Sequence, residues 1–193
     1  CEDDKIERVV TGNDVGAGIR VISGENTLYA FTNDLSKKGL IDVAEVLSRA
    51  VQGTKQDLVI NLSKIKPVID FPIIKRPEDV DIENKVEMVV KANSSARSVD
   101  ERIKQVTVSY GDVVQNVTIA NSKGVLVEDE RIRTRLVINA VASDKGQIQT
   151  GYEAIGGHAG FEYLEINQPE KLAKQAAERA LLMLKAKPAP AGK

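Results

Sequence analysis

The sequence lacks tryptophan altogether, and aromatic residues make up only 4% of its 193 residues. A hydrophobic core must therefore consist of Val, Ile, Leu and Ala, and the aromatic platforms on which single-stranded nucleic acid stacks are scarce. The one cysteine, Cys1, excludes a disulfide bond within the chain, so a reducing compartment is the simpler expectation. The one histidine, His158, cannot build a zinc site by itself.

A strong excess of one charge is also missing, as are long apolar runs. Lys and Arg number 27 against 28 for Asp and Glu, and a net charge of −1 gives no general attraction to nucleic acid or anionic lipid. No apolar run approaches the roughly 20 residues of a membrane helix. We therefore expect neither nucleic acid nor a membrane as a partner. One alternative stays open, a lipid-anchored protein that carries its anchor on Cys1.

The chain is instead rich in strand and turn signals, above all between residues 116 and 160. Two turn sequences, 121–124 and 143–146, separate long runs of Val, Ile and Thr. Gly and Asn supply the positive φ of tight turns, and β-branched side chains fit a pleated surface. This stretch therefore predicts a meander of three long strands. Further strands are predicted at residues 5–10, 15–22, 27–32, 58–62, 68–71 and 102–110.

Three amphipathic helices are predicted between and after these strands. The first begins near Ser36 and ends near Gly53, and the second covers residues 82–98. In the third, Asn167 is the expected N-cap, Pro169 suits the first turn and Glu170 suits a capping box. Its buried face is expected to contain Leu172, Ala173, Ala176, Ala177, Ala180, Leu181 and Leu184.

These elements predict an α+β protein, with an antiparallel sheet of hairpins and meander and amphipathic helices packed on one side. Residues 1–186 are expected to form one domain. Two similar halves, 1–53 and 82–186, each hold strands followed by a helix, and residues 54–81 join them. The proline-spaced residues 187–193 are typical of a stiff linker to a further domain.

No set of residues in the sequence indicates a catalytic centre. Gly16 and Gly18 precede a strand and not a helix, which disfavours nucleotide binding. The acidic residues 128–130 and the arginines that follow, Arg131, Arg133 and Arg135, are interpreted as alternating charges on an exposed hairpin face. We therefore assign no catalytic residue and no metal ligand within these 193 residues.

Several distinctive strings resemble the TldD/PmbA family, whose members are also known as modulators of DNA gyrase. They are GAGIRVISGENTLYAFTNDLS, the block from KVEMVVKANSS to RTRLVINAVA, QTGYEAIGGHAGFE, and KPAPAGK, which resembles the junction with a C-terminal domain. The resemblance covers nearly the whole chain. YAFTNDLS, VEDERIRTRL and GGHAGFE favour the TldD branch.

The resemblance implies a bacterial or archaeal cytoplasmic metallopeptidase that pairs with a PmbA/TldE-like subunit or with itself and cleaves unfolded peptides in a closed chamber. In the family, an HExxxH motif and a cysteine bind zinc. No HExxxH occurs here, so zinc is expected only in a longer protein, and this chain is expected to form the N-terminal domain that dimerises and encloses the chamber. Its candidate contacts with substrate or partner are His158, Gly157, Phe161 and Tyr29. The alternative is a non-enzymatic module that binds gyrase or a toxin–antitoxin component.

Overall fold

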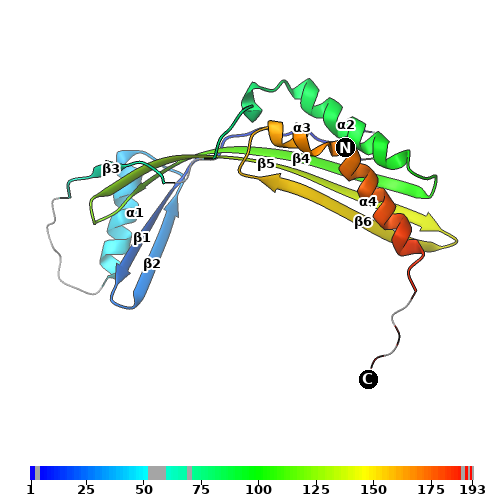
Figure 1. Ribbon diagram of the computed structural model, residues 1–193. Helices are drawn as coiled ribbons and strands as arrows, with labels where there is room; N and C mark the ends of the chain where they lie inside the picture. Colours follow the sequence, from blue (N-terminus) through cyan, green and yellow to red (C-terminus); the bar gives the residue numbers. More distant parts are fainter. Residues whose placement is uncertain (3–4, 52–59, 69–70, 188–189, 191, 193) are drawn as a thin grey trace. The chain divides into compact units, whose positions relative to one another are not determined.

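The computed structural model describes residues 1–193 except 3–4, 52–59, 69–70, 188–189, 191 and 193 (Figure 1). The chain forms two compact units, residues 10–59 and residues 1–9 with 60–193. Both combine antiparallel strands with helices, so the predicted α+β class is confirmed.

The smaller unit is a β-hairpin covered by one helix. Its elements are β1 (Ala17–Ser23), β2 (Asn26–Thr32) and α1 (Lys37–Ala50). The hairpin turns at Gly24, whose φ of 59° is readily adopted by glycine. The Ser36 hydroxyl caps α1 by accepting a hydrogen bond of 3.1 Å from the N–H of Gly39. The predicted strand at 27–32 and the predicted helix start at Ser36 are therefore confirmed.

Two aromatic rings of β2, those of Tyr29 and Phe31, pack against glycines of the opposite side of the hairpin. A Cβ on Gly16 would lie 2.4 Å from the Phe31 ring, and one on Gly18 would lie 2.5 Å from the Tyr29 hydroxyl. The glycines therefore make room for the rings, which explains why both lie within this strand region. Tyr29 and Phe31 still expose 64% and 61% of their surface.

The larger unit is a sheet with helices on one face (Figure 1). Its elements are β3 (Ser63–Ile65), the 3-10 turn η1 (Pro77–Asp79), α2 (Ile82–Arg97), β4 (Ile103–Ala120), β5 (Val125–Asp144), β6 (Gln147–Gly157), α3 (Glu162–Asn167) and α4 (Pro169–Leu184). β5 is central. It pairs antiparallel with β4 on one side, and with β6 and the short parallel strand β3 on the other.

Two tight turns connect the long strands where the sequence predicts them. At the first, the N–H of Gly124 donates to the Asn121 carbonyl over 3.1 Å, and Gly124 has a φ of 82°. At the second, Lys145 and Gly146 have φ values of 48° and 82°, the pair of positive angles that a two-residue hairpin turn requires. The predicted meander of three long strands is confirmed.

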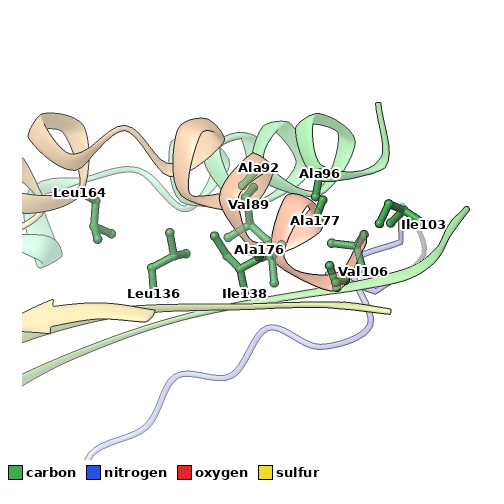
Figure 2. Close-up of a cluster of buried hydrophobic side chains, with 14 of the residues drawn as sticks. Val89, Ala92, Ala96, Ile103, Val106, Leu136, Ile138, Leu164, Ala176 and Ala177 are labelled. Carbon is green, nitrogen blue, oxygen red and sulfur yellow. The ribbon is translucent and has the colours of Figure 1, made fainter. Parts of the chain in front are cut away.

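The core lies between the sheet and the helices α2 and α4 (Figure 2). It is aliphatic, as the composition requires, and alanines dominate the helix side: Ala92, Ala96, Ala173, Ala176, Ala177 and Ala180 are all fully buried. Small side chains let α4 approach the sheet closely. A Cβ on Gly151 of β6 would lie 1.9 Å from the Ala176 carbonyl oxygen, so glycine is required at that contact.

Polar contacts add to the packing of α2 on β4. The buried Asn93 side chain donates from Nδ2 to the Val106 carbonyl over 2.9 Å. Lys85 donates from Nζ to Asp112 over 2.8 Å. Burial raises the pKa of Tyr110 above its ordinary value, and Asp112 adds to that shift. These contacts tie the helix to the strand that borders the candidate site described below.

Three predicted strands are not found among the described residues. Residues 5–10 form no strand, and Val9 and Val10 expose 55% and 66% of their surface because no neighbouring strand pairs with them. A second strand is predicted at residues 58–62. Residues 58–59 lie outside the described residues, and residues 60–62 form no strand. The strand there is β3, which begins where the Ser63 N–H donates to the Gly124 carbonyl. The third strand is predicted at residues 68–71. Residues 69–70 lie outside the described residues, and Val68 and Phe71 are not in a strand.

The predicted cap of the last helix is also wrong by one residue. Gln168, in the left-handed region with a φ of 50°, stands at the N-cap of α4 and makes no side-chain cap hydrogen bond. The reason is an unpredicted helix, α3, directly before it. Asn167 belongs to α3 and donates from Nδ2 to the Tyr163 carbonyl over 2.7 Å. Pro169 does occupy the first turn, as predicted.

Candidate functional site

The sheet of the larger unit has a second face that α2 and α4 do not cover. Side chains alternate along β5: Thr134 and Leu136 face the helices and are buried, while Arg133 and Arg135 face the other way and are exposed. Residues directly opposite in the ladder share a face, so Gly111 of β4 and Gly156 of β6 flank Arg135. We call this second face, over β4, β5 and β6, the open face.

A pocket of about 650 Å³ lies on the open face. Its lining includes Gly111, Arg133, Arg135, Gly156 and His158. The charged residues of the lining are the two arginines and Asp112, whose carboxylate pairs with Lys85, and the glycines leave the floor of the pocket without side chains. The predicted contact residues His158 and Gly157 both lie at this pocket, beyond and at the end of β6.

The arginines of the open face differ in their partners. Arg131 is paired, because its Nε donates to Asp129 over 2.7 Å. Arg133 donates from Nη2 to the Gln115 side-chain oxygen over 2.9 Å. Arg135 makes one long hydrogen bond of 3.4 Å to the Tyr152 hydroxyl. Within the described part of the chain, neither Arg133 nor Arg135 has a carboxylate within 4.0 Å. Their charges therefore have only neutral partners there.

The structure corrects the interpretation of residues 128–135 as charges that alternate on one exposed face. Glu128 and Glu130 point away from the side of Asp129 and Arg131, since neighbouring residues in a strand face opposite ways. Glu128 pairs with Lys64, and Glu130 forms a two-point ion pair with Arg76 at 2.7 and 2.9 Å. Hydrogen bonds from Arg76 lower the pKa of Glu130 below its ordinary value.

His158 is held at the pocket by an aromatic contact. Its ring stacks on Phe71 with 4.8 Å between ring centroids and 18° between the planes. The imidazole is exposed, and a stacked ring of this kind can present a nitrogen to a ligand.

The two other predicted contact residues lie elsewhere. Phe161 is only 5% exposed: its ring meets Tyr110 edge-on at 5.9 Å, and the Lys75 ammonium lies 5.1 Å from its centre. It belongs to the core on the helix side. Tyr29 is an exposed residue of the smaller unit.

A buried carboxylate, Glu162, fixes the loop that follows His158. One of its oxygens accepts from the Gly160 N–H over 3.0 Å, and the other accepts from the Lys75 N–H over 2.9 Å. The Phe161 N–H donates to the Lys75 carbonyl over 2.8 Å. The carboxylate therefore joins two segments 87 residues apart in the chain. Nothing in GFEYLEIN separates an inward-facing Glu from an outward-facing one, so the role of Glu162 could not be predicted from the sequence.

A zinc site does not fit the residues described here. Apart from the gaps stated above, no three His, Cys, Asp or Glu side chains come close enough to share a metal ion. Nor does any helix of the described ranges have the length and apolar character needed to cross a bilayer.

Two family models match the chain and together cover most of it. The model of the PmbA/TldA metallopeptidase central domain matches residues 75–184, more than half of the chain, and that of PmbA/TldA metallopeptidase domain 1 matches residues 1–53. The chain belongs to the PmbA/TldD family. The resemblance found in its sequence is thereby confirmed.

Curated relatives in the PmbA/TldD family are named as metalloproteases. A metalloprotease of Methanothermobacter thermautotrophicus is 34% identical over 196 residues, which is 100% of this chain and 42% of the relative. A TldD homologue of Haemophilus influenzae, also named a metalloprotease, is 30% identical over 187 residues, 93% of this chain and 39% of the relative. The chain thus spans about two fifths of the length of these relatives.

Solved structures of the family share the fold. A candidate modulator of a DNA gyrase from Thermotoga maritima has a TM-score of 0.68 and 27% identity, over 92% of this chain and 39% of that one. TldE of Thermococcus kodakarensis has a TM-score of 0.61 over 92% of this chain and 40% of that one. At 14% identity, the likeness to TldE concerns the fold alone.

Proposed function

We propose that this chain is the substrate-enclosing, N-terminal part of a TldD-like zinc metallopeptidase that cleaves unfolded peptides. The observation that carries the proposal is the match of the whole chain to about two fifths of a metalloprotease. The chemistry would then lie in the remaining three fifths. Residues 187–193 would lead into that part.

The zinc-binding residues of such an enzyme would lie outside these 193 residues. A single histidine cannot form the HExxxH motif that the resemblance implies. We derive no catalytic step from this chain. Its part would be to bind and orient peptides, to exclude water and folded proteins, and to contact a PmbA/TldE-like subunit or a second copy of itself, in the cytoplasm.

The edge of β4 supports a role in peptide binding. Near the start of β4, Thr107 forms an isolated β-bridge with Glu2. The next residue, Val108, exchanges two hydrogen bonds with Cys1. From Ser109 to Ala120 the outer edge has no strand partner among the described residues. An extended peptide can add to such an edge through main-chain hydrogen bonds, which suits a protease that tolerates many sequences.

The test compares this chain with the product of the longest reading frame that contains it. Both are incubated with zinc and a mixture of unfolded peptides, and the products are identified by mass spectrometry. We expect the longer protein to cleave and a chelator to stop it, while the 193-residue chain binds peptides without cleaving them. Cleavage by the 193-residue chain, or one zinc bound per chain, would contradict the proposal. So would a longer protein that stays inactive with zinc.

A second candidate is a non-enzymatic module that modulates gyrase, or acts on a toxin–antitoxin component. The link to gyrase is favoured by the description of the Thermotoga maritima structure. A direct binding titration of the purified chain with gyrase separates the two. Saturable binding that survives high salt, together with failure to bind peptides, would favour the module over the peptidase.

A further inference from the structure

We propose that Arg133 and Arg135 form a binding site for a carboxylate group of an extended peptide on the open face of the sheet. That the carboxylate belongs to a peptide rests on the proposed function. The anion site itself rests on the geometry of the pocket alone. No step of bond breaking is assigned to it.

The side chains of Arg133 and Arg135 leave the sheet in the same direction. They are two residues apart in one strand, so both rise from the same face with their Cα atoms about 7 Å apart. A guanidinium presents a planar fork of N–H donors that matches the two oxygens of a carboxylate. In the structure Arg133 reaches to Gln115 of β4 and Arg135 to Tyr152 of β6, so the two side chains would exchange these neutral partners to meet one carboxylate.

Two glycines leave space around Arg135. In the ladder, Arg135 lies between Gly111 and Gly156, so neither neighbouring strand places a side chain beside it. A Cβ on Gly156 would lie only 3.2 Å from the Cβ and Cγ of Arg135, so a larger residue there would crowd the stem of the arginine. A Cβ on Gly111 would meet nothing within 4 Å. The glycines leave open the 650 Å³ pocket, into which the arginines can reach.

The carboxylates nearest to the pocket are already paired. Asp112, which lines the pocket, pairs with Lys85, and Glu153 pairs with Arg179. Asp129, whose side chain lies on the same face as the arginines, forms an ion pair with Arg131. In the described ranges, Arg133 and Arg135 thus hold two positive charges with neutral partners only. A carboxylate brought to the pocket would gain charge-assisted hydrogen bonds without displacing an existing ion pair.

A peptide is favoured over nucleic acid as the carrier of the anion. The chain has a net charge of −1, and the pocket is lined mainly by glycine and small aliphatic residues, with one aromatic stack among the described residues, that of His158 on Phe71. Nucleic-acid sites combine many phosphate contacts with stacking platforms. A two-arginine pocket beside an unpartnered strand edge suits one carboxylate at the end, or in a side chain, of a chain that lies along the sheet.

The first experiment titrates the 193-residue chain, labelled with 15N, with N-acetylglycine and follows the Nε–Hε resonances of its arginines. We expect saturable shifts of Arg133 and Arg135, while Arg49, an exposed arginine of the smaller unit, does not shift. Inorganic phosphate is titrated in parallel. Absence of shifts at both arginines would overturn the inference, and so would phosphate that binds more tightly than N-acetylglycine, because the site would then be a phosphate site.

The second experiment uses one unfolded peptide with a free or an amidated C-terminus and measures both affinities by fluorescence anisotropy. We expect the free acid to bind about tenfold more tightly, the scale of a charge-assisted pair. Arg133→Gln and Arg135→Gln should each remove most of that difference and leave amide binding unchanged. Arg49→Gln makes the same change in net charge elsewhere, and Arg131→Gln removes an arginine already paired on the same strand. Both controls should retain the preference.

The two experiments separate this inference from the proposed function. Shifts by N-acetylglycine without binding of either peptide would overturn the assignment to a peptide, together with the proposed function, and leave an anion site. Peptide binding with equal affinity for acid and amide would overturn the arginine site and leave the proposed function standing. A preference for the acid that persists in the Arg133→Gln, Arg135→Gln double variant would place the carboxylate elsewhere.

Discussion

Replacing Glu162 by Gln should destabilise the larger unit far more than the loss of one surface charge would. The carboxylate is only 9% exposed and accepts from two backbone N–H groups, those of Lys75 and Gly160. Glutamine keeps the shape of the side chain but has only one oxygen. Its NH2 group would then face one of the two N–H donors, and that donor would lose its partner.

The magnitude follows from those two hydrogen bonds. A hydrogen bond to a charged acceptor contributes about 1.5–3 kcal/mol, and a buried donor without a partner costs about 1–3 kcal/mol. Glu162→Gln removes the charge and one of the two bonds, so we expect a loss of about 2 kcal/mol. Glu162→Ala removes both bonds but lets water reach the donors, so we expect about 3 kcal/mol.

The effect should also depend on pH in a defined direction. Burial acts to raise the pKa of Glu162, but the backbone N–H groups outweigh it and set the pKa below its ordinary value of 4.5. A carboxyl with a depressed pKa in the folded state contributes stability that is fully present above its unfolded pKa and is lost as the pH falls through the folded pKa. The difference between wild type and Glu162→Gln should be constant near neutral pH and shrink below 4.5.

Urea unfolding followed by circular dichroism gives the free energies, and hydrogen exchange of the Lys75 and Gly160 amides reports the same site locally. Glu165→Gln is the matched control, because it removes the same charge from the same short helix at an exposed pair with Lys75. We expect it to cost less than about 0.5 kcal/mol. If the two variants lost equal stability, or if the amides exchanged equally fast in both, the account of a buried anchor would be refuted.

The remaining predictions concern the packing of α2 and α4 on the sheet. Gly151→Ala places a Cβ 1.9 Å from the Ala176 carbonyl oxygen and should lower stability by about 1–3 kcal/mol or more in thermal unfolding, whereas Gly111→Ala, with open space around the added methyl, should cost almost nothing. Equal melting temperatures for the two variants would contradict this packing. Asn93→Ala removes the hydrogen bond to the Val106 carbonyl and should cost about 1–3 kcal/mol in urea unfolding, with faster exchange of nearby β4 amides. Unchanged exchange there would show that the bond does not hold α2.

The sequence predicted best those elements whose signals are local. Ser36 caps its helix through its own side chain, and the Gly124 and Gly146 turns adopt the positive φ that only a few residues tolerate. These features need no information from distant parts of the chain. The resemblance to the family could also be recognised from the sequence, because it rests on strings of residues and not on their positions in the fold.

The sequence failed where the outcome depends on a distant partner. Residues 5–10 contain the β-branched Ile6, Val9 and Val10, which favour a strand, but Val9 and Val10 lie beside no strand in the described part of the chain. The start of β3 is set by a hydrogen bond between Ser63 and Gly124, 61 residues apart, which no local pattern reveals. Glu162 similarly depends on the Lys75 backbone. A single sequence gives propensities, and long-range partners decide which of them are used.

The sequence of β5 shows its alternation of side chains but not where the buried face of the strand changes. In β5, even-numbered residues are buried from Ile132 onward, but before that point the odd-numbered residues, such as Asp129 and Arg131, are the less exposed ones. Because side chains alternate with a period of two, this change of parity means that the strand is covered on opposite faces in its two parts. A reading of the charges as one alternating series assumes a single covered face. With the change of parity between residues 131 and 132, Arg133 and Arg135 are distinct from the paired charges before them: among the described residues their partners are neutral, Gln115 and Tyr152.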